Sequence, residues 1–195
     1  MKGGNTMESA LIVSYTEKSA AFFSEVLNTA GIKQISILNS AGEARRHLLE
    51  QDFDLVIVDA PLSDESGESF SRHIASKGLS QVILAVKNEL FNAISAVCEE
   101  DGVLTISKPV DREIFWSALS LAKSAGNIIK RIQTENAKLK QKIEDIRIVD
   151  RAKCLLISYL NLSEQEAHRF IEKQAMDLRS TKRAIAEEIL KTYAN

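Results

Sequence analysis

Five short apolar runs alternate with segments of helical spacing over residues 10–123 of the chain. The runs cover residues 10–15, 35–38, 55–60, 82–86 and 103–107. The intervening segments, at residues 17–30, 41–50, 69–76, 90–100 and 112–123, have the apolar spacing of helices. Strands that are apolar throughout are typical of a parallel sheet that helices cover on both faces. The pattern therefore predicts a doubly wound α/β domain with a five-stranded parallel sheet, whose functional edge is the carboxyl end of the strands.

Composition excludes several classes of protein. Of 195 residues, 45% are hydrophobic and 27% are charged, which is ordinary for a globular protein. No run reaches the length of a membrane span, and no basic and apolar leader opens the sequence. Two cysteines, Cys98 and Cys154, provide neither a disulfide framework nor a multi-cysteine metal site. We therefore expect a cytoplasmic protein without a membrane partner.

Charge is distributed unevenly along the chain. The net charge is −2, yet the residues from 128 onward hold 14 Lys and Arg against 10 Asp and Glu. An acidic front joined to a mildly basic back indicates separate domains, with any polyanion bound at the back. We expect an α/β domain at residues 8–124, a coiled-coil helix at 125–150 and a three-helix domain at 151–195.

Two charged residues fall at the predicted functional edge of the sheet. Asp59 ends the third strand, with Pro61 and Gly67 in the loop that follows, and Lys108 ends the fifth strand directly before Pro109. This order and spacing resemble the receiver domain of two-component response regulators, a flavodoxin-like, CheY-like fold. The resemblance implies that Asp59 accepts a phosphoryl group and that Lys108 stabilises its charge.

Other receiver positions depart from this family. Receivers carry an acidic pair after the first strand, a Ser or Thr at the tip of the fourth and an aromatic residue in the fifth. The corresponding residues here are Ser14 and Tyr15, Ala85 or Val86, and Thr105. Mg²⁺ needs anionic oxygen ligands, which only Glu17 or Asp64 could supply, from displaced positions. We therefore favour a pseudo-receiver that requires no cofactor and holds Asp59 and Lys108 as an ion pair. Phosphoryl acceptance at Asp59 is the alternative.

The segment after the α/β domain has a heptad pattern. Its a and d positions are Ile129, Ile132, Asn136, Leu139, Ile143 and Ile146. Asn at a single a position favours a parallel dimer in register, because the same residue of the partner satisfies its amide best. We predict a homodimer through this seam; the alternative is a helix that packs on its own receiver domain.

The end of the chain has the pattern of three helices. The first continues to Asn161, and Ser163 with Glu166 forms a capping box for the second. Ser180 is the predicted cap of the third. The inward face of the second helix is expected to hold Ala167, Phe170, Ile171, Ala175 and Met176. The third is expected to bury Ile185, Ile189 and Leu190, with Ala186 allowing close approach.

This tail resembles the ANTAR domain, the RNA-binding module of transcription antitermination regulators. The residues that carry the resemblance are Ala152-Lys153, Leu156, Ser163, Glu166-Ala167, Ala175-Met176, Arg179 and Ala186. Cys154 departs from the family, which usually has Gly there. A degraded receiver before this tail is most similar to the amidase-operon type of antiterminator, which a partner protein governs. The resemblance implies binding to stem-loops of nascent mRNA.

Basic and aromatic residues in the tail are candidates for RNA contacts. Cations at the corner of the three helices could bind phosphates; they are Arg151, Lys153, Arg169, Lys173, Arg179, Lys182 and Arg183. Tyr159, His168 and Tyr193 could stack on unpaired bases. The competing interpretation is that these cations are only solvated.

Two functions follow from these patterns. The first is a dimeric RNA-binding antiterminator, not an enzyme, that is controlled by a regulatory protein. The second is a phospho-accepting receiver, controlled by a sensor kinase, whose tail serves dimerisation or partner contact. The three histidines are scattered and form no zinc or triad site.

Overall fold

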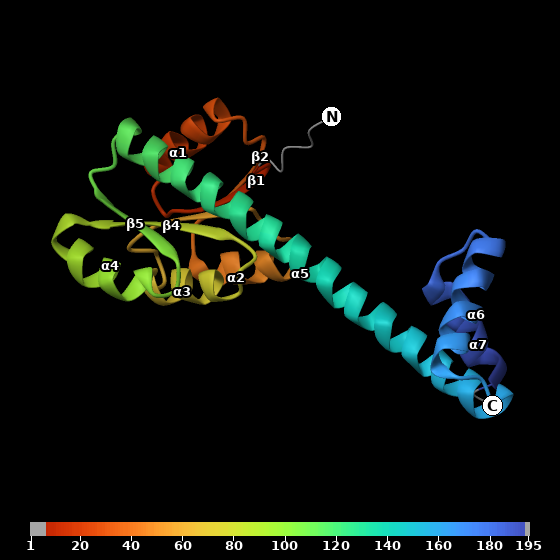
Figure 1. Cartoon of the computed structure of the whole chain (residues 1–195). Coiled ribbons are helices and arrows are strands. Elements are labelled where there is room, and N and C mark those ends of the chain that lie inside the picture. Colours follow the sequence, from red (N-terminus) through yellow and green to blue (C-terminus); the bar gives the residue numbers. More distant parts are fainter. Residues whose placement is uncertain (1–6, 194–195) are drawn as a thin grey trace. The chain divides into compact units, whose positions relative to one another are not determined.

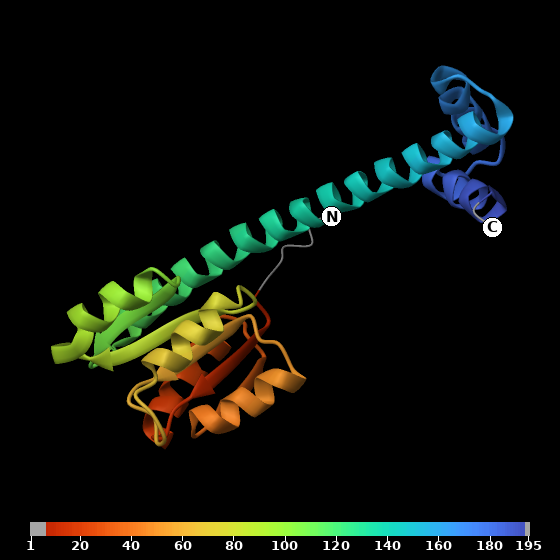
Figure 2. The same ribbon diagram turned by 90° about the horizontal axis from the view of Figure 1, so that it is seen from below.

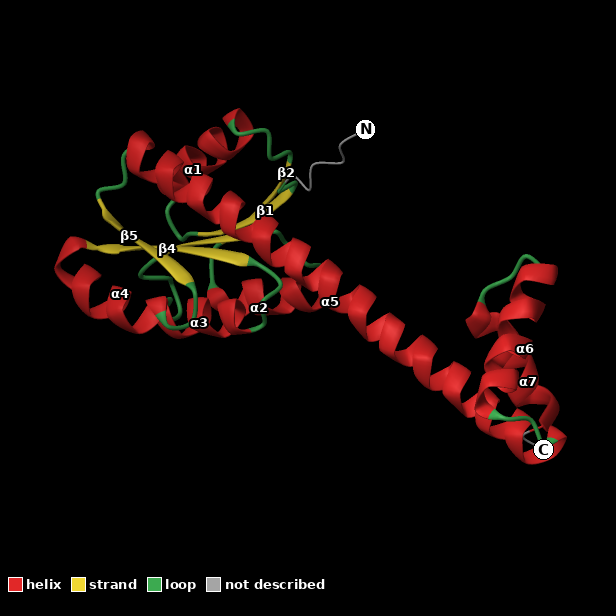
Figure 3. Cartoon of the chain, viewed as in Figure 1, coloured by secondary structure: helices red, strands yellow, loops and turns green. Residues whose placement is uncertain are grey.

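The computed structural model describes residues 7–193 and divides into two compact units, Met1–Arg131 and Ile132–Asn195. Helix α5 (Arg112–Leu160) belongs to both, because the division falls within it. Where sequence spacing indicates a helix at 112–123 and a separate coiled-coil segment, the structure has one uninterrupted helix of 49 residues (Figures 1 and 3). Within residues 7–193, no helix is both long and apolar enough to cross a membrane.

The first unit contains the predicted five-stranded parallel sheet. Its strands are β1 (Ser9–Val13), β2 (Gln34–Leu38), β3 (Leu55–Asp59), β4 (Gln81–Lys87) and β5 (Val103–Lys108), in the order β2-β1-β3-β4-β5. Every residue of β3 is buried, as expected for a central strand covered on both faces. The register places Asp59 beside Ala85 of β4, and β4 in turn pairs with β5. Asp59 and Lys108 therefore meet at the carboxyl edge.

Helices cover both faces of this sheet. Helix α1 (Glu17–Thr29) and the start of α5 lie on one face, where Phe23 and Phe115 pack with 4.9 Å between ring centroids. Helices α2 (Ala41–Glu50), α3 (Glu68–Ser76) and α4 (Phe91–Glu99), with the 3₁₀ turn η1 (Asn88–Leu90), lie on the other face, which Figure 2 views. Because successive side chains of a strand point to opposite faces, each strand contributes to both apolar cores. This is the doubly wound fold that the sequence predicts.

The second unit is a three-helix bundle. The end of α5 packs with α6 (Glu164–Asp177) and α7 (Lys182–Tyr193) around a core that includes Ala152, Ile171 and Ala186. The predicted capping box is present: the amide of Glu166 donates to Ser163 Oγ, and the Glu166 carboxylate accepts from the amide of Ser163.

Two details of this bundle differ from the sequence expectation. Thr181 rather than Ser180 caps α7, because its Oγ1 accepts from the amide of Ala184 at 3.1 Å. The buried stripe of α6 is Ala167, Ile171 and Ala175, so Phe170 and Met176, expected inside, are 39% and 78% exposed. Met176 lies five residues after Ile171. Five residues are not a whole number of helical turns, so the Met176 side chain points away from the buried face.

Candidate functional site

The first candidate site is the carboxyl edge of the sheet around Asp59. The Asp59 side chain is only 2% exposed, and its Oδ1 forms an ion pair with Lys108 Nζ. The same ammonium donates to the backbone carbonyl of Ala60 at 2.6 Å. Strands β3 and β5 thus bring together the two residues that the sequence selects at this edge.

Two hydroxyl groups contact the other oxygen of the Asp59 carboxylate. Ser14 Oγ donates to Asp59 Oδ2 at 2.7 Å, and Thr16 Oγ1 lies 3.3 Å from the same atom. Ser14 stands where receivers have an acidic residue, and in this chain it supplies a hydrogen-bond donor instead. Sequence reasoning missed Thr16, which only its spacing two residues after Ser14 could have indicated. Both carboxylate oxygens are therefore engaged by donors of the chain itself.

The residues of this site do not fit a bound Mg²⁺. The side chains that contact Asp59 supply two hydroxyls and an ammonium, whereas Mg²⁺ prefers carboxylate and carbonyl oxygens. Asp64 is committed elsewhere, because its carboxylate accepts from the amides of Ala41 and Gly42 at 2.9 and 2.8 Å. These hydrogen bonds lower the pKa of Asp64. Among residues 7–193, no three His, Cys, Asp or Glu side chains gather in a way that could hold a metal ion.

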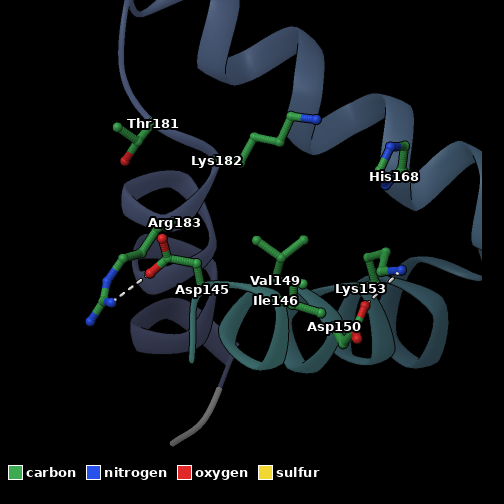
Figure 4. Close-up of a pocket in the computed structure, with 9 residues that line it drawn as sticks. All are labelled: Asp145, Ile146, Val149, Asp150, Lys153, His168, Thr181, Lys182 and Arg183. Carbon is green, nitrogen blue, oxygen red and sulfur yellow. Dashed lines mark hydrogen bonds and ion pairs between the residues drawn. The ribbon is translucent and has the colours of Figure 1, made fainter. Parts of the chain in front are cut away.

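The second candidate site is a pocket of about 440 Å³ on the three-helix unit, which we call the cation pocket (Figure 4). Ile146 and Val149 of α5 provide apolar lining, and His168 contributes from α6. Three of the predicted RNA-binding cations also line it: Lys153, Lys182 and Arg183.

Each of these three cations already has acidic partners within the unit. Lys153 lies 2.8 Å from Asp150 and 2.9 Å from Glu164. Arg183 binds Asp145 at 2.7 Å and Glu187 at 2.8 Å. Lys182 pairs with Glu172. The pairs with Asp150 and Glu164 raise the pKa of Lys153 to about 12, and the hydrogen bond from Arg183 lowers the pKa of Asp145.

The other four predicted cations have no such pairs. Arg151, Arg169, Lys173 and Arg179 are exposed, and their side chains form no ion pair with any residue in the range 7–193. Arg179 connects α6 and α7 with a left-handed φ of 48°. The expected single cluster of seven is thus two sets: three cations paired at the cation pocket and four unpaired ones outside its lining.

The three residues predicted to stack on bases also lie at different places on the unit. The Tyr159 and Tyr193 rings pack together with centroids 5.4 Å apart, whereas His168 lies in the cation pocket, 3.2 Å from Glu172. Sequence reasoning missed Phe170, which lines a different groove together with Tyr193.

The predicted dimer seam is an exposed apolar stripe in the single chain. Exposure ranges from 37% at Ile129 to 60% at Ile146, and Leu139 and Ile143 are 56% and 52% exposed. Asn136 is exposed on the same helix. The arrangement leaves the seam open for a partner, and dimerisation stays a prediction.

Comparison with known families decides the identity of both units. Residues 10–120 match the response regulator receiver domain, and residues 137–190 match the ANTAR domain. The chain belongs to the response regulators with an ANTAR domain. Its sequence is 28% identical over 139 residues to the transcriptional regulatory protein PdtaR of Mycobacterium tuberculosis, covering 71% of this chain and 68% of that protein. It is 31% identical over 116 residues to the aliphatic amidase regulator of Pseudomonas aeruginosa, covering 56% of each.

Solved structures show the same fold for the receiver of this response regulator. The receiver domain of an HD domain-containing protein from Pseudomonas fluorescens has a TM-score of 0.59 at 20% identity, covering 67% of this chain and 97% of that one. A response regulator from Chloroflexus aurantiacus has a TM-score of 0.53 at 19% identity, covering 60% and 98%. These likenesses confirm the predicted fold, and the receiver resemblance seen in the sequence is confirmed by the family match over residues 10–120.

Proposed function

We propose that this response regulator is a transcription antiterminator that acts as a dimer and binds stem-loops of nascent mRNA through its ANTAR domain. The observation that carries the proposal is the ANTAR match over residues 137–190, on a bundle that exposes unpaired cations such as Arg169 and Lys173. Such cations can bind phosphates without breaking an internal ion pair. The protein has no catalytic role in this proposal and works in the cytoplasm.

A direct binding measurement tests this function. The purified full-length protein is titrated with the RNA of its own upstream leader and with a variant of equal length in which one strand of each stem is changed so that the stems cannot pair. We expect the leader to bind at least about tenfold more tightly, since a specific site adds base contacts to the shared phosphate contacts. Equal affinity for the two RNAs would contradict specific stem-loop recognition.

We further propose that the receiver is a pseudo-receiver, which a regulatory protein controls in place of a sensor kinase. Support comes from Asp59, whose two oxygens are engaged by Lys108 and by the Ser14 and Thr16 hydroxyls. A phosphoryl donor reaching this carboxylate must displace those donors without the charge neutralisation that Mg²⁺ gives in receivers.

Accordingly, acetyl phosphate with Mg²⁺ is expected to leave Asp59 essentially unmodified. Intact-mass measurement detects the added phosphoryl group, and Asp59→Ala serves as the control for labelling at other residues. A large phosphorylated fraction that disappears in Asp59→Ala would establish the phospho-accepting alternative.

A further inference from the structure

A second groove opens on the three-helix unit, separate from the cation pocket. It has a volume of about 290 Å³ and lies between the end of α5, α6 and α7. Phe170 and Gln174 of α6 line this groove, whereas His168 lines the cation pocket, so the two openings flank α6 on different sides. The groove includes the buried core side chains of Leu156 and Ile189. We call it the aromatic groove.

Two aromatic residues line this groove. Phe170 is 39% exposed, and Tyr193 is partly buried against the core of the three-helix unit. The Tyr193 ring packs against the Tyr159 ring, and the two ring planes form an angle of 40°. The Tyr159 side chain is 59% exposed. An aromatic side chain that stays exposed at a concave surface is typical of an interaction site, because its burial by a partner is favourable.

Polar side chains at the groove limit what can fill it. Gln174 and Glu188 line the groove, and their side chains form no hydrogen bond or ion pair within the described chain. An apolar occupant would bury the amide and the carboxylate without partners, which costs free energy. The occupant must therefore combine a flat face for the rings with hydrogen-bond donors for the carboxylate. A nucleobase has both.

Charge on α6 favours the same occupant. Lys173 lies one turn from both Arg169 and Phe170, so two unpaired cations flank the aromatic residue on the exposed side of the helix. A phosphate bound by these cations would place its base within reach of the groove. Glu188 faces the base rather than the phosphate in this arrangement.

We propose that the aromatic groove binds one unpaired base of an RNA loop, stacked on Phe170 and Tyr193 with its edge towards Gln174 and Glu188. The inference rests on the proposed RNA binding and names the part of the RNA that this side of α6 recognises. Adenine and cytosine offer an exocyclic amino group to the Glu188 carboxylate. Uracil offers only a ring N–H between two carbonyl oxygens, which the carboxylate repels, so the groove selects against uracil.

Short single-stranded oligoadenylate, oligocytidylate and oligouridylate are the probes for this site, with the full-length protein. We expect oligoadenylate and oligocytidylate to bind about five- to tenfold more tightly than oligouridylate. Phe170→Leu should weaken the first two about tenfold, because it removes a stacking face and keeps an apolar side chain. Glu188→Gln should remove most of the preference without weakening oligouridylate binding.

Met176→Leu is the matched control, since Met176 is 78% exposed on the same helix and does not line the groove; no change is expected. Equal binding of the three oligomers by the parent and by Phe170→Leu would overturn the groove proposal, while retained leader binding would leave the proposed function standing. Conversion of a dimer to a monomer by Phe170→Leu would also overturn it, by assigning the groove to a contact between copies. Failure of the parent to bind any RNA would reject both proposals.

Discussion

Replacing Arg151, Arg169 and Lys173 together with alanine is expected to lower the affinity for the leader RNA by at least about tenfold at moderate salt. These side chains are exposed and form no internal ion pair within residues 7–193, so no ion pair has to break when they contact phosphates. Each lost contact should also flatten the dependence of log affinity on log salt by about 0.7 to 0.9, or about two to three units for the set. Titrations at several salt concentrations measure both effects.

The matched control removes the same charge from the receiver. Lys33, Lys77 and Lys87 are exposed there, and their replacement by alanine should leave RNA affinity and its salt dependence unchanged. A folded Arg151, Arg169 and Lys173 variant that binds the leader as tightly as the parent would contradict an ANTAR surface built on unpaired cations.

The sequence alone would have selected different residues for this experiment. Spacing at the start of the predicted third helix of the tail indicates Arg179, Lys182 and Arg183 as one exposed group, because helical periodicity gives the faces of single helices. It does not reveal that Asp145, 38 residues earlier, binds Arg183, or that Glu172 of α6 binds Lys182. Arg183→Ala would leave the carboxylates of Asp145 and Glu187 without their partner near the RNA. A loss of RNA affinity could then come either from the missing phosphate contact or from repulsion between these carboxylates and the phosphates.

For the receiver, the sequence predicts both the fold and part of the candidate site. Uninterrupted apolar runs predict the parallel sheet, and the strand ends predict that Asp59 and Lys108 meet, because topology brings those ends to one edge. The hydroxyl donors on Asp59 are not predictable in the same way. Ser14 and Thr16 reach the carboxylate through the local course of the loop after β1, which residue types alone do not specify.

Changing Leu139 and Ile143 to aspartate is expected to convert the dimer into a monomer. Both side chains are more than half exposed in the single chain, and in a parallel coiled coil they would face their counterparts across the seam. The double variant places four carboxylates in the seam of a dimer, where desolvation and mutual repulsion oppose association. We expect the dissociation constant to rise at least about a hundredfold, or about 2.7 kcal/mol. Light scattering across a concentration series measures the change.

The control for the seam introduces two aspartates per chain just outside it. Ala137 and Lys138 are exposed at the b and c positions of the heptad that holds Leu139, so their replacement by aspartate should leave the dimer intact. Loss of the dimer should also weaken binding to a leader with two stem-loops, because linked sites bind the second stem-loop at a high effective concentration. A Leu139 and Ile143 double variant that stays dimeric would reject the seam. A monomeric variant that binds such a leader as tightly as the parent would separate dimerisation from RNA recognition.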